Sequence, residues 1–95
     1  MIAVHPGRIL KRELQARDLS ASRLALALRL PSGRITDILN GKRGISPETA
    51  LRFARYFGNG PNFWLNLQMA YELAVAEREI GARILDEVTP APVAA

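Results

Sequence analysis

The sequence predicts a single all-α domain made of five helices. Prolines occur where helices would begin, glycines follow two of the apolar helical repeats, and no stretch alternates apolar and polar residues as a strand would. Pro6, Pro31, Pro47 and Pro61 mark four of the starts, because the first turn of a helix makes no use of the N–H that proline lacks. A chain of 95 residues, 48% of them hydrophobic, has the size of one small domain.

The first two helices are short, and a capping residue separates them. The first is expected from about Pro6 to Arg17, and Ser20 can cap the second, expected from about Ala21 to Leu28. Apolar residues at helical spacing form the inner faces: Ile9, Leu10 and Leu14 in the first helix, and Leu24, Ala25 and Leu28 in the second.

The third helix is expected from about Ser32 to Leu39, and Gly41 lies just beyond its end. Ile35, Ile38 and Leu39 face inward at helical spacing. The outward positions hold polar side chains, namely Arg34, Thr36, Asp37 and Asn40. This helix therefore presents one apolar face to the core and one polar face to solvent.

The last two helices begin at prolines. Ser46-Pro47-Glu48 supplies a capping oxygen, a preset φ and a favourable acid for the fourth helix, which Gly58 ends. The fifth is expected from Pro61 to about Val88. Residues 1–88 thus form the domain, and the proline-containing stretch 89–95 is expected to be a disordered tail. The apolar residues of the fourth helix are Ala50, Leu51, Phe53 and Ala54.

Charge is distributed unevenly along the chain. Residues 1–55 contain eleven Lys or Arg against four Asp or Glu, whereas residues 56–95 contain two against five. The first part is therefore +7 and the second −3. A basic lobe on a small domain favours binding to phosphates through the release of counterions, so double-stranded DNA is the first partner to consider.

The second and third helices have the character of a helix-turn-helix. Two short helices follow each other across a tight turn, with the small Ala25 where they would cross and the large Ile35 and Ile38 where the second must anchor in the core. The polar outward face of the third helix can enter a major groove about 12 Å wide, and basic neighbours can contact phosphates. Residues 20–43 supply both features.

A string of short motifs in residues 5–71 resembles the HigA-type antitoxins and, more widely, the lambda-repressor-like regulators of the Xre type. The motifs are His5-Pro6-Gly7 followed by Ile9-Leu10, then residues 34–45 (RITDILNGKRGI), 49–58 (TALRFARYFG) and 63–68 (FWLNLQ). Their order is far more specific than a helix-turn-helix pattern alone, and they cover about two-thirds of the chain.

The resemblance implies a fold and a function. It implies a five-helix lambda-repressor-like DNA-binding domain, with an extended C-terminal helix, that dimerises on palindromic operator DNA in its own promoter. It also implies that the protein neutralises a HigB-type, RelE-like toxin that cleaves mRNA. Matching the family's recognition helix places Ser32, Gly33, Thr36 and Asp37 toward bases and Arg34 toward a base or a phosphate. The full expected set of DNA contacts is Ser20, Ser22, Arg23, Ser32, Gly33, Arg34, Thr36, Asp37, Asn40, Lys42 and Arg43.

Two positions depart from the family pattern. Arg29 stands where the turn between the second and third helices usually has Gly, so the turn needs either an arginine with positive φ or a different geometry. Gly33 stands where relatives tend to have a long polar side chain. Base recognition at that point is therefore expected to be weak or indirect.

Aromatic residues cluster between Phe53 and Tyr71, and the fifth helix has more apolar surface than four short helices can cover. We therefore expect a homodimer that buries part of it. The predicted interface residues are Trp64, Leu67, Tyr71, Ile80 and Ile84.

Other functions are less well supported by the residues. His5 is the only histidine and the chain has no cysteine, so we expect no metal site, no cofactor and a local structural role for His5. No nucleophile is grouped with a base, so we expect no enzyme. No long apolar segment or leader pattern appears, so we expect a cytoplasmic protein away from membranes. A regulator without a toxin, and a module that binds an acidic protein or RNA, remain open, as does the toxin-binding surface.

Overall fold

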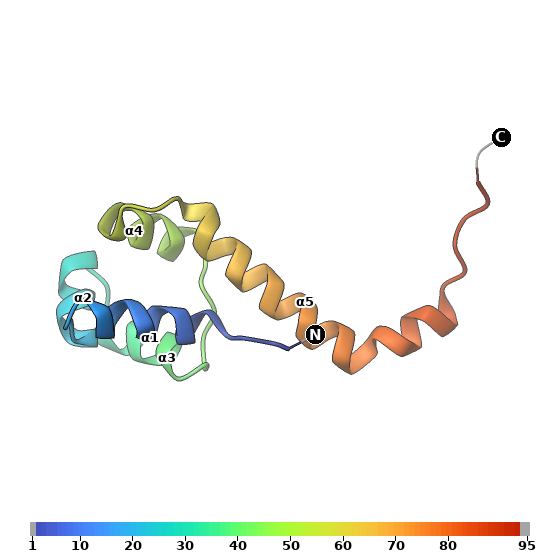
Figure 1. Cartoon of the computed structure of the whole chain (residues 1–95), viewed down its shortest axis with the longest axis horizontal. Coiled ribbons are helices and arrows are strands. Elements are labelled where there is room, and N and C mark those ends of the chain that lie inside the picture. Colours follow the sequence, from blue (N-terminus) through green and yellow to red (C-terminus); the bar gives the residue numbers. More distant parts are fainter. Residues whose placement is uncertain (1, 94–95) are drawn as a thin grey trace.

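Residues 2–93 are described by a computed structural model, and every regular element in that range is an α-helix (Figure 1). The all-α, five-helix prediction is therefore confirmed. Two predicted ends move by one residue, because Arg17 and Val88 are end caps and not helical residues. The helices are α1 (Pro6–Ala16), α2 (Ala21–Leu28), α3 (Ser32–Leu39), α4 (Pro47–Phe57) and α5 (Pro61–Glu87).

Capping side chains set the helix starts. The Ser20 hydroxyl accepts a hydrogen bond from the Arg23 amide at 3.1 Å, and the Ser46 hydroxyl accepts one from the Thr49 amide at 3.3 Å. Each bond satisfies one of the amides that the first turn of a helix leaves unpaired. Gly58 ends α4 in the left-handed conformation, with φ 80°. The start and stop signals in the sequence therefore act where they were expected.

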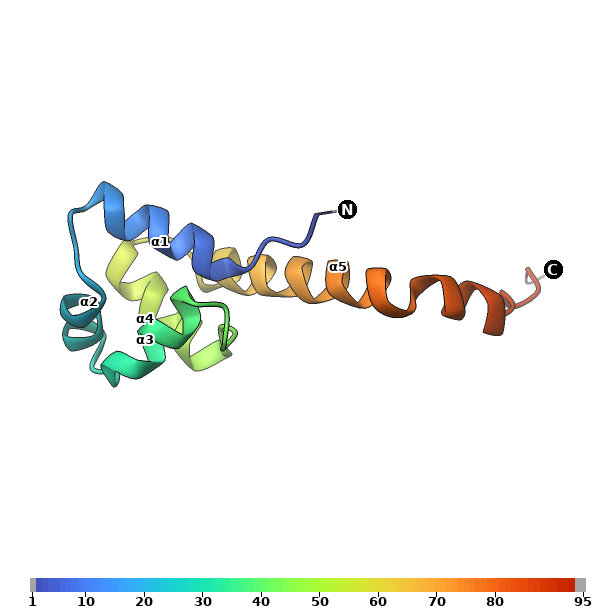
Figure 2. The same ribbon diagram turned by 90° about the horizontal axis from the view of Figure 1, so that it is seen from below.

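The four short helices form one group, and only the first half of α5 packs against it (Figures 1 and 2). Figures 1 and 2 show α5 leaving this group as a long arm, and the chain measures 56 × 27 × 22 Å along its principal axes. Contacts to α5 come from α4 and α1. Within the described range, even the 27-residue α5 lacks an apolar stretch that could span a bilayer. Residues 88–93 follow the helix without regular structure, and the last two predicted tail residues lie outside the described range.

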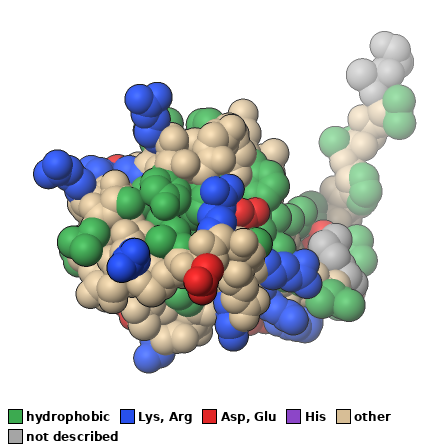
Figure 3. Space-filling view, turned by 60° about the vertical axis from the view of Figure 1, so that its left-hand side comes forward, with side chains coloured by type: hydrophobic (Ala, Val, Ile, Leu, Met, Phe, Trp, Pro, Cys, Tyr) green, Lys and Arg blue, Asp and Glu red, His purple; other side chains and the backbone are tan. Residues whose placement is uncertain are grey.

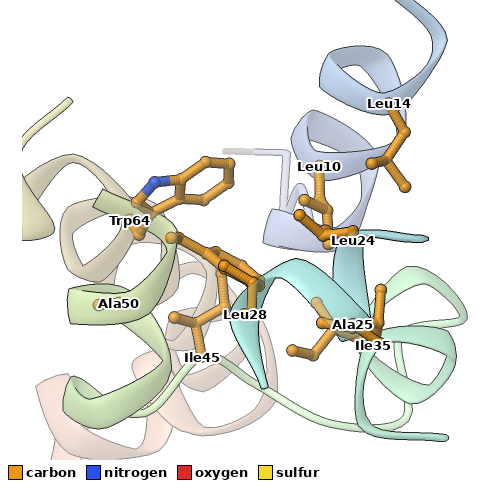
Figure 4. Packing of buried hydrophobic residues seen from close by; sticks show 11 residues of the cluster. Leu10, Leu14, Leu24, Ala25, Leu28, Ile35, Ile45, Ala50 and Trp64 are labelled. Atoms are coloured by element: carbon orange, nitrogen blue, oxygen red, sulfur yellow. The ribbon is translucent and has the colours of Figure 1, made fainter. Parts of the chain in front are cut away.

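The core lies where α1 to α4 meet the start of α5 (Figure 4). The predicted inner faces of α1, α2 and α3 are confirmed, with Ile9 and Leu39 only partly buried at its margin. Leu51 differs from its apolar neighbours on α4, because 61% of its surface is exposed. The buried cluster consists of Leu10, Leu14, Leu24, Ala25, Leu28, Ile35, Ile38, Ile45, Ala50, Phe53 and Trp64.

Trp64 belongs to the core, which corrects its predicted place in a dimer interface. Its indole has no exposed surface and packs edge-on against Phe53, with the ring centroids 4.9 Å apart. The indole Nε1 donates to the Asn59 side-chain oxygen at 3.0 Å, so its one polar atom is satisfied within the chain. The aromatic cluster gave no way to tell from sequence which ring faces inward.

Candidate nucleic-acid interface

The turn between α2 and α3 uses a left-handed arginine. Arg29 has φ 58° and ψ 44°, which settles how this turn is built without the usual glycine. Such a conformation costs a non-glycine residue about 1 kcal/mol or more. Two backbone hydrogen bonds close the motif, from Arg29 N to Leu26 O at 3.2 Å and from Leu30 N to Ala25 O at 2.9 Å. This is a Schellman ending, which satisfies the last carbonyls of α2.

Arg52 on α4 holds the same turn from the other side. Its Nη1 donates to the Leu28 carbonyl at 2.8 Å, and its Nη2 lies 3.2 Å from the Glu48 carboxylate. Glu48 and Arg52 are four residues apart on α4, whereas the contact with Leu28 joins residues 24 apart and has no local signal in the sequence. Arg52 therefore helps to fix the angle between the two helices of the helix-turn-helix.

The start of α3 is open. Pro31 occupies the N-cap position and no side chain caps the helix, so its first amides are not paired by a capping group. Ser32 and Gly33 are exposed, and a Cβ on Gly33 would meet nothing within 4 Å. The Thr36 hydroxyl is held to the Ser32 carbonyl at 3.1 Å. This end of α3 therefore offers backbone donors and small polar groups to a groove.

A basic turn follows α3. Gly41 adopts φ 74°, and the Asp37 carbonyl accepts from the amides of Lys42 at 2.8 Å and Arg43 at 3.2 Å. Both basic side chains point to solvent as exposed residues. No ion pair in residues 2–93 joins Asp37 to Arg34, so neither side chain is occupied by the other. The turn thus places two free cations beside the polar face of α3.

Two of the predicted contact residues, from different helices, lie beside one hollow. Ser20, at the start of α2, and Asn40, at the end of α3, line the same shallow hollow with Lys11. Figure 3 shows more Lys and Arg than Asp and Glu side chains on the face formed by the short helices. All the predicted contact residues are exposed or half-buried: Ser20, Ser22, Arg23, Ser32, Gly33, Arg34, Thr36, Asp37, Asn40, Lys42 and Arg43.

His5 has the local structural role that the sequence indicated. It is the N-cap of α1, and its Nδ1 accepts from the Gly7 amide at 2.9 Å. Burial lowers the pKa of His5 below its usual 6.5, and this effect exceeds the opposing one of a hydrogen bond to the Arg43 backbone. The ring is therefore neutral at pH 7, as an acceptor in a cap must be.

Acid is expected to weaken the fold through His5. The pKa of His5 is lower in the folded chain than in the unfolded chain. Its contribution to the free energy of unfolding is therefore complete above pH 6.5 and is lost as the pH falls toward the folded-state pKa. Thermal unfolding should show a lower Tm at pH 5.5 than at pH 7.5, and a smaller drop in a His5→Asn variant, whose side chain does not titrate. An equal drop in both proteins would assign the effect to other groups.

The comparisons with known proteins agree with this geometry. A family model described as helix-turn-helix matches residues 10–64. Virulence-associated protein I of Dichelobacter nodosus is 49% identical over 80 residues, which are 83% of this chain and 74% of that protein.

Two solved structures cover nearly the whole chain. An addiction module antidote protein of the HigA family from Coxiella burnetii superposes with a TM-score of 0.94 and 50% identity, over 96% of this chain and 100% of the other. The Pseudomonas aeruginosa antitoxin HigA, solved with the higBA promoter, superposes with a TM-score of 0.93 and 40% identity, over 96% and 100%. The chain therefore belongs to the HigA antitoxin family, which is part of the Xre-like class of helix-turn-helix proteins.

Proposed function

We propose that this protein is an antitoxin that represses its own operon. In this proposal a dimer binds palindromic operator DNA through α3 and the turn after it, and a separate surface neutralises a HigB/RelE-like toxin that cleaves mRNA. The observation that supports it best is the open, polar start of α3 with free Lys42 and Arg43 at its other end. A relative of 40% identity has been solved with promoter DNA.

The far half of α5 supports the dimer. Ile80 and Ile84 are 43% and 47% exposed. Ile84 lines an apolar groove with Leu73 and Leu85, on the part of α5 that extends away from the short helices (Figures 1 and 2). Leu67 and Tyr71 are half-buried nearer the core. A second copy would cover this surface and set two α3 helices about 34–36 Å apart, which is the distance between successive major grooves on one side of DNA.

Operator binding and toxin binding are tested separately. The chain is expressed with and without the adjacent reading frame, and each preparation is titrated against its promoter duplex and a scrambled duplex. Specific promoter binding with a co-purifying toxin, whose mRNA cleavage the chain suppresses, is the expected result. Promoter binding without a toxin would indicate a stand-alone regulator. Salt-sensitive binding without sequence preference would indicate a module that binds RNA or an acidic protein.

Arg34→Ala is expected to reduce operator affinity by about 1–3 kcal/mol and to relax the preference for one base pair, because a guanidinium can bond a guanine through two donors. Binding to a set of single-base operator variants measures both effects. Arg83→Ala is the matched control, since it removes the same charge from the exposed arm of α5. Equal affinity of the Arg34 and Arg83 variants for the operator would exclude Arg34 from the interface.

Lys42→Ala is expected to weaken binding to every duplex alike. A lysine that neutralises one phosphate releases about one counterion, so the slope of log K against log salt should become less steep by about one unit. With three or four phosphate contacts in each protomer, the wild-type dimer should have a slope of about −5 to −7. An unchanged slope in the variant would show that Lys42 does not contact the DNA backbone.

A further inference from the structure

A glutamine on α5 holds the loop between α3 and α4, which consists of residues 40–46. The side-chain oxygen of Gln68 accepts a hydrogen bond from the Ile45 amide at 2.9 Å. Figure 1 shows this loop crossing from α3 to α4 beside α5. Lys42 and Arg43, the proposed phosphate contacts, belong to the same loop. The glutamine therefore joins the long helix to the loop that carries the two free cations.

The approach of Gln68 to the loop requires a glycine. A Cβ on Gly44 would lie 2.7 Å from Nε2 and 2.8 Å from Cδ and Oε1 of Gln68, which is closer than atoms in proteins pack. Gly44 is not among the glycines with positive φ, so its backbone could accept an alanine. The small size of this residue, and not its conformational freedom, is what the contact uses.

The two ends of the loop are held by different helices. At the start, the Asp37 carbonyl accepts from the amides of Lys42 and Arg43, which ties these residues to α3. At the end, the Ile45 side chain is 4% exposed and belongs to the core, and Gln68 pairs its amide. A buried amide without a partner would be unfavourable, so this bond favours one position of the loop on α5.

Gln68 also lies on the helix that is proposed to form the dimer. Leu67 and Tyr71, two of the predicted interface residues, are its neighbours at one and three positions along α5. If two copies meet through α5, the position of each basic loop relative to the partner's loop depends on how the loop is attached to that helix. Gln68 supplies such an attachment.

We infer that Gln68 is a positioning residue of the DNA-binding surface. It holds the loop after α3 against the dimer helix, so that Lys42 and Arg43 of both protomers reach the DNA backbone together. Without this contact the loop must be ordered when the DNA binds, which reduces the affinity. The inference rests on the proposed operator binding, and Gln68 is not among the side chains expected to contact DNA.

Two substitutions break the contact from opposite sides. Gln68→Met keeps a flexible side chain of similar length and helix propensity but removes the acceptor oxygen. Gly44→Ala adds the Cβ that displaces the glutamine amide. Gln68→Glu keeps an acceptor. Asn59→Ala is the matched control, because it removes the oxygen that accepts from Trp64 Nε1 at 3.0 Å, away from the DNA-binding set.

We expect Gln68→Met and Gly44→Ala each to weaken operator binding about three- to tenfold, because ordering the loop then costs about what the lost hydrogen bond contributed. Asn59→Ala should keep the wild-type affinity, measured at a temperature where every variant is folded. In a chain with Lys42→Ala and Arg43→Ala, adding Gln68→Met should change affinity by less than about twofold, since the side chains that the loop positions are gone. Wild-type affinity in Gln68→Met, or an undiminished effect in that background, would overturn the inference.

Amide hydrogen exchange without DNA tests the attachment itself. The Ile45 amide should exchange at least about tenfold faster in Gln68→Met and Gly44→Ala than in the wild type, because its partner is lost. In Gln68→Glu it should exchange at close to the wild-type rate. Equal rates in all four proteins, with the operator still bound by the wild type, would overturn this inference alone. If the wild type does not bind the operator, the proposed function fails and this inference fails with it.

Discussion

Trp64→Ala should lower the free energy of unfolding by about 3–5 kcal/mol, because it removes a fully buried side chain and leaves a cavity in the core. The indole has no exposed surface and lies 4.9 Å from Phe53 and 5.1 Å from Phe63, centroid to centroid. Its loss also leaves the Asn59 side chain without its 3.0 Å partner. Small domains have only about 5–15 kcal/mol in total, so the variant should be partly unfolded at 37 °C.

Urea denaturation at a fixed chain concentration measures the change. Leu26→Ala is the control, since 78% of Leu26 is exposed and its truncation should cost less than about 0.5 kcal/mol. A loss below 1 kcal/mol for Trp64→Ala would mean that the indole is not packed as the structure shows. A similar loss for both variants would mean that the loss does not come from the burial of the indole.

Replacing Ile80 and Ile84 together by Glu should convert the proposed dimer into a monomer. One charge would then lie in the apolar groove of α5 that Ile84 lines, and the other one helical turn before it, where a second copy would have to bury them without partners. A monomer binds one half of the palindrome. It loses the additional affinity that comes from linking two DNA-binding domains in one dimer, so operator affinity should fall by about 100-fold or more. Gel filtration and operator titration measure the two effects on the same preparation.

Arg78→Glu is the matched control, because it changes the net charge by the same two units at an exposed position on α5. It should remain dimeric and lose only the small part of its affinity that depends on overall charge. If the double isoleucine variant keeps the wild-type elution volume, the dimer does not use this groove. If the wild type itself elutes as a monomer at micromolar concentration, the dimer proposal is wrong.

The order and type of the helices could be predicted because each has a local signal. Ser20 and Ser46 are capping residues, prolines mark helix starts and Gly58 ends α4, and each of these depends only on neighbours in sequence. The polar face of α3 could be predicted for the same reason, since helical spacing alone separates Ile35 and Ile38 from the residues that face outward.

Contacts between distant residues could not be predicted in this way. The bond from Arg52 to the Leu28 carbonyl, the packing of His5 on Tyr71 and the burial of Trp64 each depend on how complete helices are arranged. The left-handed Arg29 is a related case, because arginine has no local preference for positive φ and the surrounding hydrogen bonds impose it. These residues determine the geometry of the candidate interface. They are not among the side chains expected to contact DNA.

Operator recognition is best tested by titrating the purified chain against a duplex of its own promoter and a scrambled duplex of the same length and composition, at physiological salt. The proposal predicts two chains on each palindrome and an affinity at least about 1,000-fold higher for the promoter than for the scrambled duplex. Equal affinities for the two duplexes would contradict it, because they would show that the basic surface binds phosphates without α3 reading bases.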